Sequence, residues 1–198
     1  MKQKHWPYLL GIGAFFIIGW GMITFTQFRE NVSTSLEGVH YILFLKTYPS
    51  KSPGETTLRR GDIVSIQGFE PAYVGEKPFT KRVLGLPGDL IVKDKKSVQL
   101  ASSTRLFRTR GLKECIPKAF MSWRLRSQTR VPATFEPVTL PLLEKTSDGK
   151  PLTPISATSV PEGYVFVAGD HPNSFDSRYE EFGLVPIEKI WGKAVLCW

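Results

Sequence analysis

The stretch Lys81-Arg-Val-Leu-Gly-Leu-Pro-Gly-Asp89 has the pattern of a short strand that ends in a Pro-Gly turn. Asp62-Ile-Val-Ser-Ile66 precedes it, directly after an Arg-Gly turn, and predicts a neighbouring strand. Asp89-Leu-Ile-Val-Lys93 restarts a strand after the turn. Short strands separated by glycine and proline favour an antiparallel sheet or a small barrel over a helical fold.

The same pattern continues on both sides of this stretch. The alternation of Tyr41, Leu43 and Leu45 is a weak strand signal, residues 164–168 are strongly β-like, and the apolar residues 190–198 predict a last strand. The 15 prolines and 17 glycines among 198 residues agree with many turns. The predicted fold is therefore mainly β. Residues 105–154, first basic and then proline-rich, fit less well and are expected to form an insertion in the β core.

The N-terminal segment has a different composition. No residue from Trp6 to Phe28 carries a charge, and a helix of that length would span about 34 Å, enough for a bilayer core. Lys2 and Lys4 precede the run and should stay on the cytoplasmic side. We expect a cytoplasmic tail at 1–5, a transmembrane anchor at 6–28 and an extracytoplasmic domain at 29–198. A cleaved signal peptide is the alternative, but the run is long and no small-x-small site follows it.

The net charge of +8 is concentrated in one stretch, in which residues 105–130 contain eight lysines and arginines and a single acid, Glu114. A basic stretch suits nucleic acid or anionic lipid. Because the predicted topology places it outside the cytoplasm, lipid or plain solvent is favoured and nucleic acid is not expected.

The two cysteines, Cys115 and Cys197, do not have metal-ligand spacing, and His5, His40 and His171 are scattered. The sequence therefore predicts no metal site and no cofactor. If the domain lies on the oxidising side of a membrane, two alternatives remain, namely a Cys115–Cys197 disulfide or two free thiols.

Three separated segments carry residues suited to chemistry. They are residues 31–41 directly after the apolar run, residues 81–89, and Gly169-Asp-His-Pro-Asn-Ser-Phe-Asp-Ser-Arg178. Each alone has an ordinary explanation, such as a loop, a solvated strand face or a turn. Their order and spacing together are more specific.

Taken together, the segments resemble the signal peptidase I family, whose members cut leader peptides with a Ser/Lys dyad outside the cytoplasmic membrane. Residues 81–89 nearly match the family's lysine box, and Gly169-Asp170 with Ser174, Asp176, Ser177 and Arg178 is similar to its C-terminal box, one residue shorter. The family also implies a β-rich domain behind one transmembrane helix.

The serine segment departs from the usual family form. It keeps Ser33 and Ser35 but has Leu36 and Glu37 where methionine and a nearby proline are usual. Asn31, Tyr41 and the run Phe175-Asp-Ser-Arg-Tyr179 make it more similar to the TraF-like branch, which matures pilins in conjugative transfer systems. The resemblance implies a leader peptide or prepilin as substrate.

The resemblance implies a role for each site residue. Ser35 would be the nucleophile and Lys81 its general base. Independently of the resemblance, a lysine can act as a base only when its pKa is lowered, and we expect Val83, Leu84 and nearby strand residues to form the apolar pocket that lowers it. Ser33 and the backbone N–H of Ser35 would form the oxyanion hole. Further residues would orient the lysine and hold the surroundings of its amine, namely Ser174, Asp176 and Arg178.

A non-catalytic assembly factor on the same fold is the alternative function. Glu37, at the position of the usual proline, is its main support. The presence of every residue with a catalytic role in the family favours the peptidase.

Overall fold

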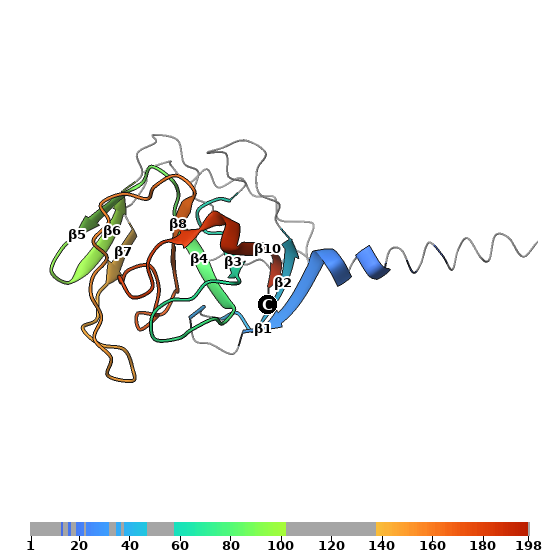
Figure 1. The fold of residues 1–198 in the computed structure, drawn as a ribbon, viewed down its shortest axis with the longest axis horizontal. Helices are drawn as coiled ribbons and strands as arrows, with labels where there is room; N and C mark the ends of the chain where they lie inside the picture. The colour runs from blue at the N-terminus through green and yellow to red at the C-terminus, as the bar shows by residue number, and fades with distance from the viewer. Residues whose placement is uncertain are drawn as a thin grey trace, which may run out of the picture.

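The protein folds into two antiparallel sheets, seen side by side in Figure 1. The computed structural model describes residues 58–101, 138–197, 23–31 and 38–46, and positions 13, 16, 19–21, 35 and 36. Within these ranges all strand pairs are antiparallel. The prediction of a mainly β, antiparallel fold is confirmed.

The larger sheet has seven strands in the order β1-β2-β10-β3-β4-β8-β9. Five of these strands overlap segments that the sequence predicted as strands, whereas β1 and β9 were not predicted. The strands are β1 Thr26–Glu30, β2 Tyr41–Lys46, β3 Ile63–Ile66, β4 Phe79–Gly85, β8 Tyr164–Ala168, β9 Val185–Pro186 and β10 Ile190–Cys197.

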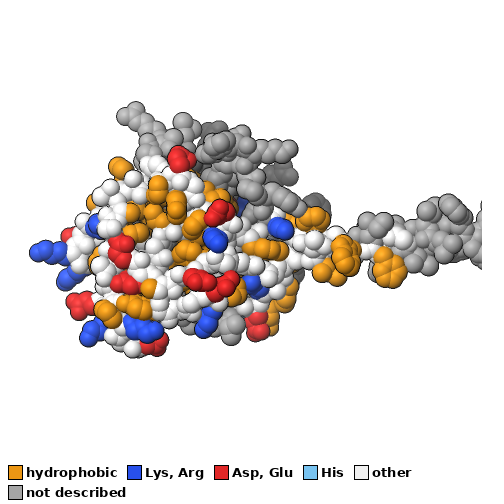
Figure 2. All heavy atoms as spheres, viewed as in Figure 1, with side chains coloured by type: hydrophobic (Ala, Val, Ile, Leu, Met, Phe, Trp, Pro, Cys, Tyr) orange, Lys and Arg blue, Asp and Glu red, His pale blue; other side chains and the backbone are white. Residues whose placement is uncertain are grey.

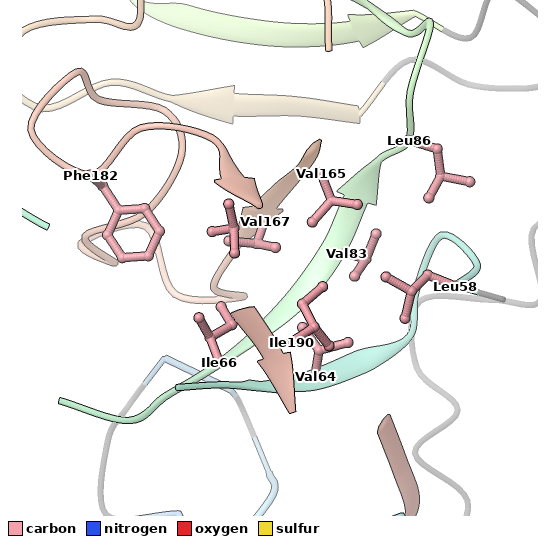
Figure 3. Close-up of a cluster of buried hydrophobic side chains, with 10 residues drawn as sticks. Leu58, Val64, Ile66, Val83, Leu86, Val165, Val167, Phe182 and Ile190 are labelled. Carbon is pink, nitrogen blue, oxygen red and sulfur yellow. The ribbon is translucent and has the colours of Figure 1, made fainter. Parts of the chain in front are cut away.

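The strand β4, which contains the stretch that predicted the fold, lies between β3 and β8. Its partners are in register at Lys81↔Val64 and Arg82↔Ala168. Both neighbours are apolar, so their side chains form the main hydrophobic cluster, drawn in Figure 3. Burial of this cluster fixes β4 in the middle of the sheet.

The smaller sheet consists of β5 Leu90–Lys93, β6 Ser97–Ala101 and β7 Val138–Pro141, in the order β5-β6-β7. A second cluster, which includes Leu100 and Phe166, joins it to β8 of the larger sheet. The strand β7 corrects one expectation, because it lies inside the predicted insertion 105–154. The strands β5 and β6 pair with each other, and β7 pairs with the other edge of β6. Residues 138–141 of that segment therefore belong to the β core.

The turn between β4 and β5 is held by a buried ion pair. Arg60 donates to both carboxylate oxygens of Asp89, and Asp89 Oδ2 also accepts the Leu86 N–H at 2.8 Å. Asp89 is 1% exposed. The acid at the end of the quoted stretch thus ties the β4–β5 turn to the start of β3.

The N-terminal region enters the sheet through β1. This strand begins at Thr26, so the last three residues of the predicted span 6–28 pair with β2 instead of extending a helix. Among the described residues, no helix is long and apolar enough to cross a membrane. Residues 1–12 of the predicted tail and anchor lie outside the described residues, as do Cys115 and the basic stretch 105–130. Cys197, at the end of β10, is buried and disulfide-bonded.

Candidate active site

Three of the predicted site residues meet around the amine of Lys81. Lys81 Nζ donates to Ser174 Oγ at 2.7 Å and lies 3.2 Å from Ser35 Oγ. Lys81 comes from β4, Ser35 from the turn between β1 and β2, and Ser174 from the loop after β8. Lys81 and Ser174 are 4% and 5% exposed, so the amine is nearly removed from water.

The Ser35 turn is fixed by hydrogen bonds at its base and its tip. Asn31 Nδ2 donates to the carbonyls of Leu36 at 3.3 Å and Val39 at 2.8 Å, which closes the loop between β1 and β2. The Asp170 N–H donates to the Ser35 carbonyl at 2.6 Å. This last bond connects the serine turn directly to the loop that carries Ser174.

Gly169 is required where these two segments converge. A Cβ at this position would lie 2.2 Å from Ser174 Oγ and 2.8 Å from the Ser35 carbonyl oxygen. A Cβ atom does not make non-bonded contacts this short. The glycine of the Gly-Asp pair therefore lets the two serines approach the same lysine.

The Ser174 loop is held by a buried ion pair. Asp176 and Arg178 form two hydrogen bonds, at 2.8 and 2.9 Å, and are 0% and 1% exposed. Asp176 Oδ2 also accepts the Gly169 N–H at 3.0 Å, and Arg178 donates to the Ser174 carbonyl at 2.7 Å. Arg178 Nη1 reaches the carbonyl of Pro141 in β7 at 2.7 Å. Asp176 and Arg178 thus position Ser174 through the backbone of its loop.

Burial sets the protonation of Lys81. Desolvation lowers the pKa of Lys81 from 10.5 to about 8, because the charged amine loses its hydration. Asp176 acts in the opposite direction and Arg178 in the same direction. A fraction of the protein therefore carries a neutral amine near neutral pH, and a neutral amine can accept the proton of a serine hydroxyl.

A second ion pair was not foreseen as part of the site. Arg82, beside Lys81, donates from Nε and Nη2 to the two Asp170 carboxylate oxygens, each at 2.8 Å. Arg82 Nη1 also donates to the Gly61 carbonyl at 3.1 Å. Both residues lie in the motifs quoted from the sequence, so adjacency to Lys81 and Gly169 was the available signal. The pair fixes the segment whose N–H binds Ser35.

A pocket of about 280 Å³ opens beside the Ser35–Lys81 pair. Its apolar wall consists of Val74, Pro78, Phe79 and Phe175, and its polar lining includes Thr80, His171 and Asn173. Val83 and Leu84 are not among the lining residues of this pocket. They belong to the two hydrophobic clusters, because successive residues of β4 point to opposite faces of the strand.

The remaining predictions for this site fall on residues that the structure leaves out of its description. These are Ser33, the predicted side-chain oxyanion donor, and Glu37. What the described residues offer is a serine hydroxyl beside a buried amine of lowered pKa, with a second hydroxyl fixing that amine. Such an arrangement can activate a serine for attack on a carbonyl carbon without a histidine.

Known proteins give an independent comparison. Residues 4–198 match the family model described as signal peptidase, peptidase S26. A crystal structure of a signal peptidase I from Enterococcus faecalis is similar over 70% of this chain and 97% of that chain, with 24% identity and a TM-score of 0.35. No curated protein sequence matches the chain. Because the family match covers almost every residue, the chain belongs to the signal peptidase family, peptidase S26.

Proposed function

We propose that this protein is a membrane-anchored serine endopeptidase that removes leader peptides from exported proteins, with Ser35 as nucleophile and Lys81 as general base. The members of its family are serine endopeptidases. One observation carries the assignment of the dyad. The Lys81 amine lies 3.2 Å from Ser35 Oγ, in a site where burial lowers the lysine pKa to about 8.

In the proposed reaction, neutral Lys81 takes the Ser35 proton as Oγ attacks the scissile carbonyl. The N–H donated to Ser174 Oγ directs the amine's lone pair toward Ser35. The tetrahedral intermediate then collapses, the Lys81 ammonium gives its proton to the leaving amine, and an acyl-enzyme remains. A water molecule, deprotonated by the same lysine, hydrolyses the ester and restores Ser35.

The developing oxyanion needs donors of its own. The family resemblance assigns this role to the Ser33 hydroxyl and the Ser35 backbone N–H. Loss of one such donor lowers the rate by about 10²–10³.

For the substrate, we propose a prepilin or another protein of a conjugative transfer system. The support is the resemblance of Asn31, Tyr41 and Phe175-Asp-Ser-Arg-Tyr179 to the TraF-like branch. In the fold, Asn31 closes the loop that carries Ser35, and Phe175 lines the pocket beside it.

We place the enzyme in a bacterial inner membrane, with its N-terminus in the cytoplasm and its catalytic domain in the periplasm. The charge-free run 6–28 supports this placement. Exposed apolar side chains continue from that run onto the adjacent strands, including Phe28 and Tyr41, whose rings stack at 5.7 Å. Figure 2 shows such side chains where the chain leaves the sheets toward the N-terminus. The proposed partners are the leader peptide and membrane lipid, without nucleic acid.

A non-catalytic assembly factor is the second candidate, favoured by Glu37 at the position of the usual proline. One experiment separates the two. The full-length protein, purified in detergent, is incubated with candidate co-expressed pilin precursors, and products are identified by mass spectrometry. We expect cleavage by the wild type and none by Ser35→Ala. Equal processing by the two proteins, or by neither with every precursor, would favour the assembly factor.

The proposed topology has its own test. Protease added to spheroplasts should digest the domain 29–198, whereas full protection of that domain in intact spheroplasts would contradict the proposed orientation.

A further inference from the structure

The loop between β3 and β4 contributes two residues, Val74 and Pro78, to the wall of the pocket beside Ser35. Tyr73 precedes Val74 and has a φ of 78°. Among the described residues, no other non-glycine residue has a positive φ. A bulky residue in this region is strained, and such strain persists only where surrounding contacts impose it.

Contacts from a separate segment surround Tyr73. Its hydroxyl donates to the Pro151 carbonyl at 3.1 Å. Lys150 Nζ donates to the Tyr73 carbonyl at 3.3 Å and lies 5.1 Å from the centre of the Tyr73 ring. Lys150 and Pro151 belong to the turn that follows β7, which is closed by a Leu152 N–H to Glu144 carbonyl bond of 2.9 Å. Hydrogen bonds from this turn therefore hold Tyr73 in its strained conformation.

Tyr73 is connected to the pocket through one of its lining residues, Phe175. Its ring stacks on Phe175, with centroids 6.1 Å apart and planes at 27°. Phe175 lines the pocket and follows Ser174 in the chain. It also meets Phe182 edge-on at 5.4 Å, and Phe182 packs on Phe79, another wall residue, at 5.6 Å. The two aromatic wall residues, Phe79 and Phe175, are thus joined through Phe182, and Phe175 is in turn joined to Tyr73.

The loop itself has few other restraints near Val74. The Ala72 N–H donates to the Glu181 carbonyl at 2.8 Å, and the bonds from Val74 and Gly75 to the Pro71 carbonyl are long, at 3.5 and 3.4 Å. Tyr73 is 41% exposed, so hydrophobic burial alone does not explain its fixed position. The position of Tyr73 is instead explained by its contacts with the turn after β7 and with Phe175.

We propose that Tyr73 is a positioning residue that sets the shape of the substrate pocket. Clamped between Phe175 and the turn 144–152, it holds Val74 in the wall and thereby selects the size of the substrate side chain that fits beside Ser35. The selection of a side chain rests on the proposed peptidase function. The clamp itself does not.

The test uses p-nitrophenyl esters with acyl chains of two to eight carbons, which probe the pocket without knowledge of the natural substrate. Full-length protein in detergent is assayed for kcat and KM along the series. For Tyr73→Ala we expect the ratio of kcat/KM between long and short chains to change by about 2- to 12-fold, the factor that corresponds to the loss of one aromatic pair. The kcat/KM for the acetate ester, whose acyl chain is the shortest of the series, is the reference for that ratio.

Three further variants separate positioning from general stability. Tyr73→Phe keeps the stacked ring and should restore most of the wild-type profile. Tyr73→Gly also removes the ring, so it should alter the profile as Tyr73→Ala does. Because glycine adopts a positive φ without strain, Tyr73→Gly should unfold at a higher temperature than Tyr73→Ala. Tyr164→Ala is the matched control, because Tyr164 is exposed to a similar extent, 39%, and begins β8 away from the lining residues.

Hydrogen exchange measured by mass spectrometry tests the clamp independently of activity. In Tyr73→Ala, deuterium uptake should increase in peptides covering 71–78 and 171–176, and Tyr164→Ala should leave both unchanged. If wild type and Ser35→Ala hydrolyse every ester equally slowly, the proposed peptidase function fails, and exchange alone decides the clamp. Unchanged exchange in Tyr73→Ala, or an unchanged profile with an active wild type, overturns the inference.

Discussion

Lys81 and Arg178 are two buried basic residues that both bind Ser174, and their surroundings shift their pKa values in opposite directions. Arg178 is bound by the Asp176 carboxylate and by the carbonyls of Ser174 and Pro141. The described hydrogen bonds of Lys81 Nζ go to two hydroxyls. Burial lowers the pKa of Lys81 to about 8, whereas the pKa of Arg178 is raised, because its bonds to Asp176 outweigh its desolvation.

The difference shows how one loop can hold a permanent charge and a labile one close together. A compensated guanidinium is a fixed structural element, and an uncompensated amine becomes a base. Variants that exchange these basic groups, or displace the residues around them, test this difference.

The largest effect is expected from Lys81→Arg, which gives both sites a guanidinium. Because a guanidinium stays protonated, the variant has no base, and kcat should fall by about 10²–10⁴ or more. In the wild type, activity should rise with pH through about 8 as Lys81 becomes neutral. Precursor processing followed by mass spectrometry from pH 6 to 10 measures both. A Lys81→Arg variant with normal activity would remove Lys81 from the mechanism.

Removal of the uncompensated amine should stabilise the fold. The unfolded chain keeps the Lys81 proton up to about pH 10.5, whereas the folded protein releases it near 8. Between these values the unfolded state binds more protons, so stability increases with pH, and below pH 8 the buried charge costs about 3 kcal/mol. Lys81→Met should therefore be inactive but about 3 kcal/mol more stable at pH 7, and this advantage should shrink toward pH 10.5.

Urea unfolding of the two proteins at pH 7 and pH 10 measures this difference. The other titrating groups are common to both chains, so their contributions cancel. Arg178→Met is the contrasting variant: it leaves Asp176 buried without its cation and should lose about 3–5 kcal/mol. A Lys81→Met variant less stable than the wild type at pH 7 would show that the amine is compensated after all.

Displacement of the serines should reduce activity by about 10²-fold, as expected for a shift of about 1 Å at a reacting centre. Gly169→Ala would do this, because its Cβ would overlap Ser174 Oγ and approach the Ser35 carbonyl. Gly85→Ala is the matched control, since its Cβ would lie 2.8 Å from Phe166 Cβ in the core, outside the catalytic groups. The ratio of kcat to the amount of folded protein separates the two. Equal loss in both variants would assign the effect to folding alone.

The smallest effect is expected from His171→Ala. His171 lines the pocket, and its Nδ1 accepts the Asn173 N–H at 3.1 Å. The proposed mechanism gives it no proton to transfer, so activity should change by about twofold or less and the midpoint of the pH profile should stay near 8. A midpoint that moves in this variant would indicate that the histidine, too, influences the base.

Local sequence patterns predicted the centre of the fold well. Alternation and turn residues located β2, β3, β4, β5, β8 and β10 to within a few residues. They missed β1, because Thr26–Phe28 continue the apolar run and give no sign of pairing with β2. They also missed β7, because Val138–Pro141 contains a proline and follows a proline-rich stretch. The strand forms because its residues pair with β6, which is distant in the sequence.

The site was predictable in part for a similar reason. The resemblance to the signal peptidase I boxes identified Ser35, Lys81 and Ser174, which the fold brings within hydrogen-bond distance. The contact between Tyr73 and Phe175 could not be predicted, because it arises only through tertiary packing of the β3–β4 loop on the Ser174 loop. The ion pair between Arg82 and Asp170 joins residues 88 positions apart, a pairing that no local pattern encodes.

The Lys81 amine draws its two hydroxyl partners from positions 46 and 93 residues away along the chain. Contacts of such long sequence separation form late, because the chain must first lose the entropy of closing large loops. A partly folded molecule with an intact β3–β4 hairpin would hold the lysine without either serine. Catalytic activity should therefore be the last property gained during refolding, and a molecule whose larger sheet is incomplete should not cleave other proteins.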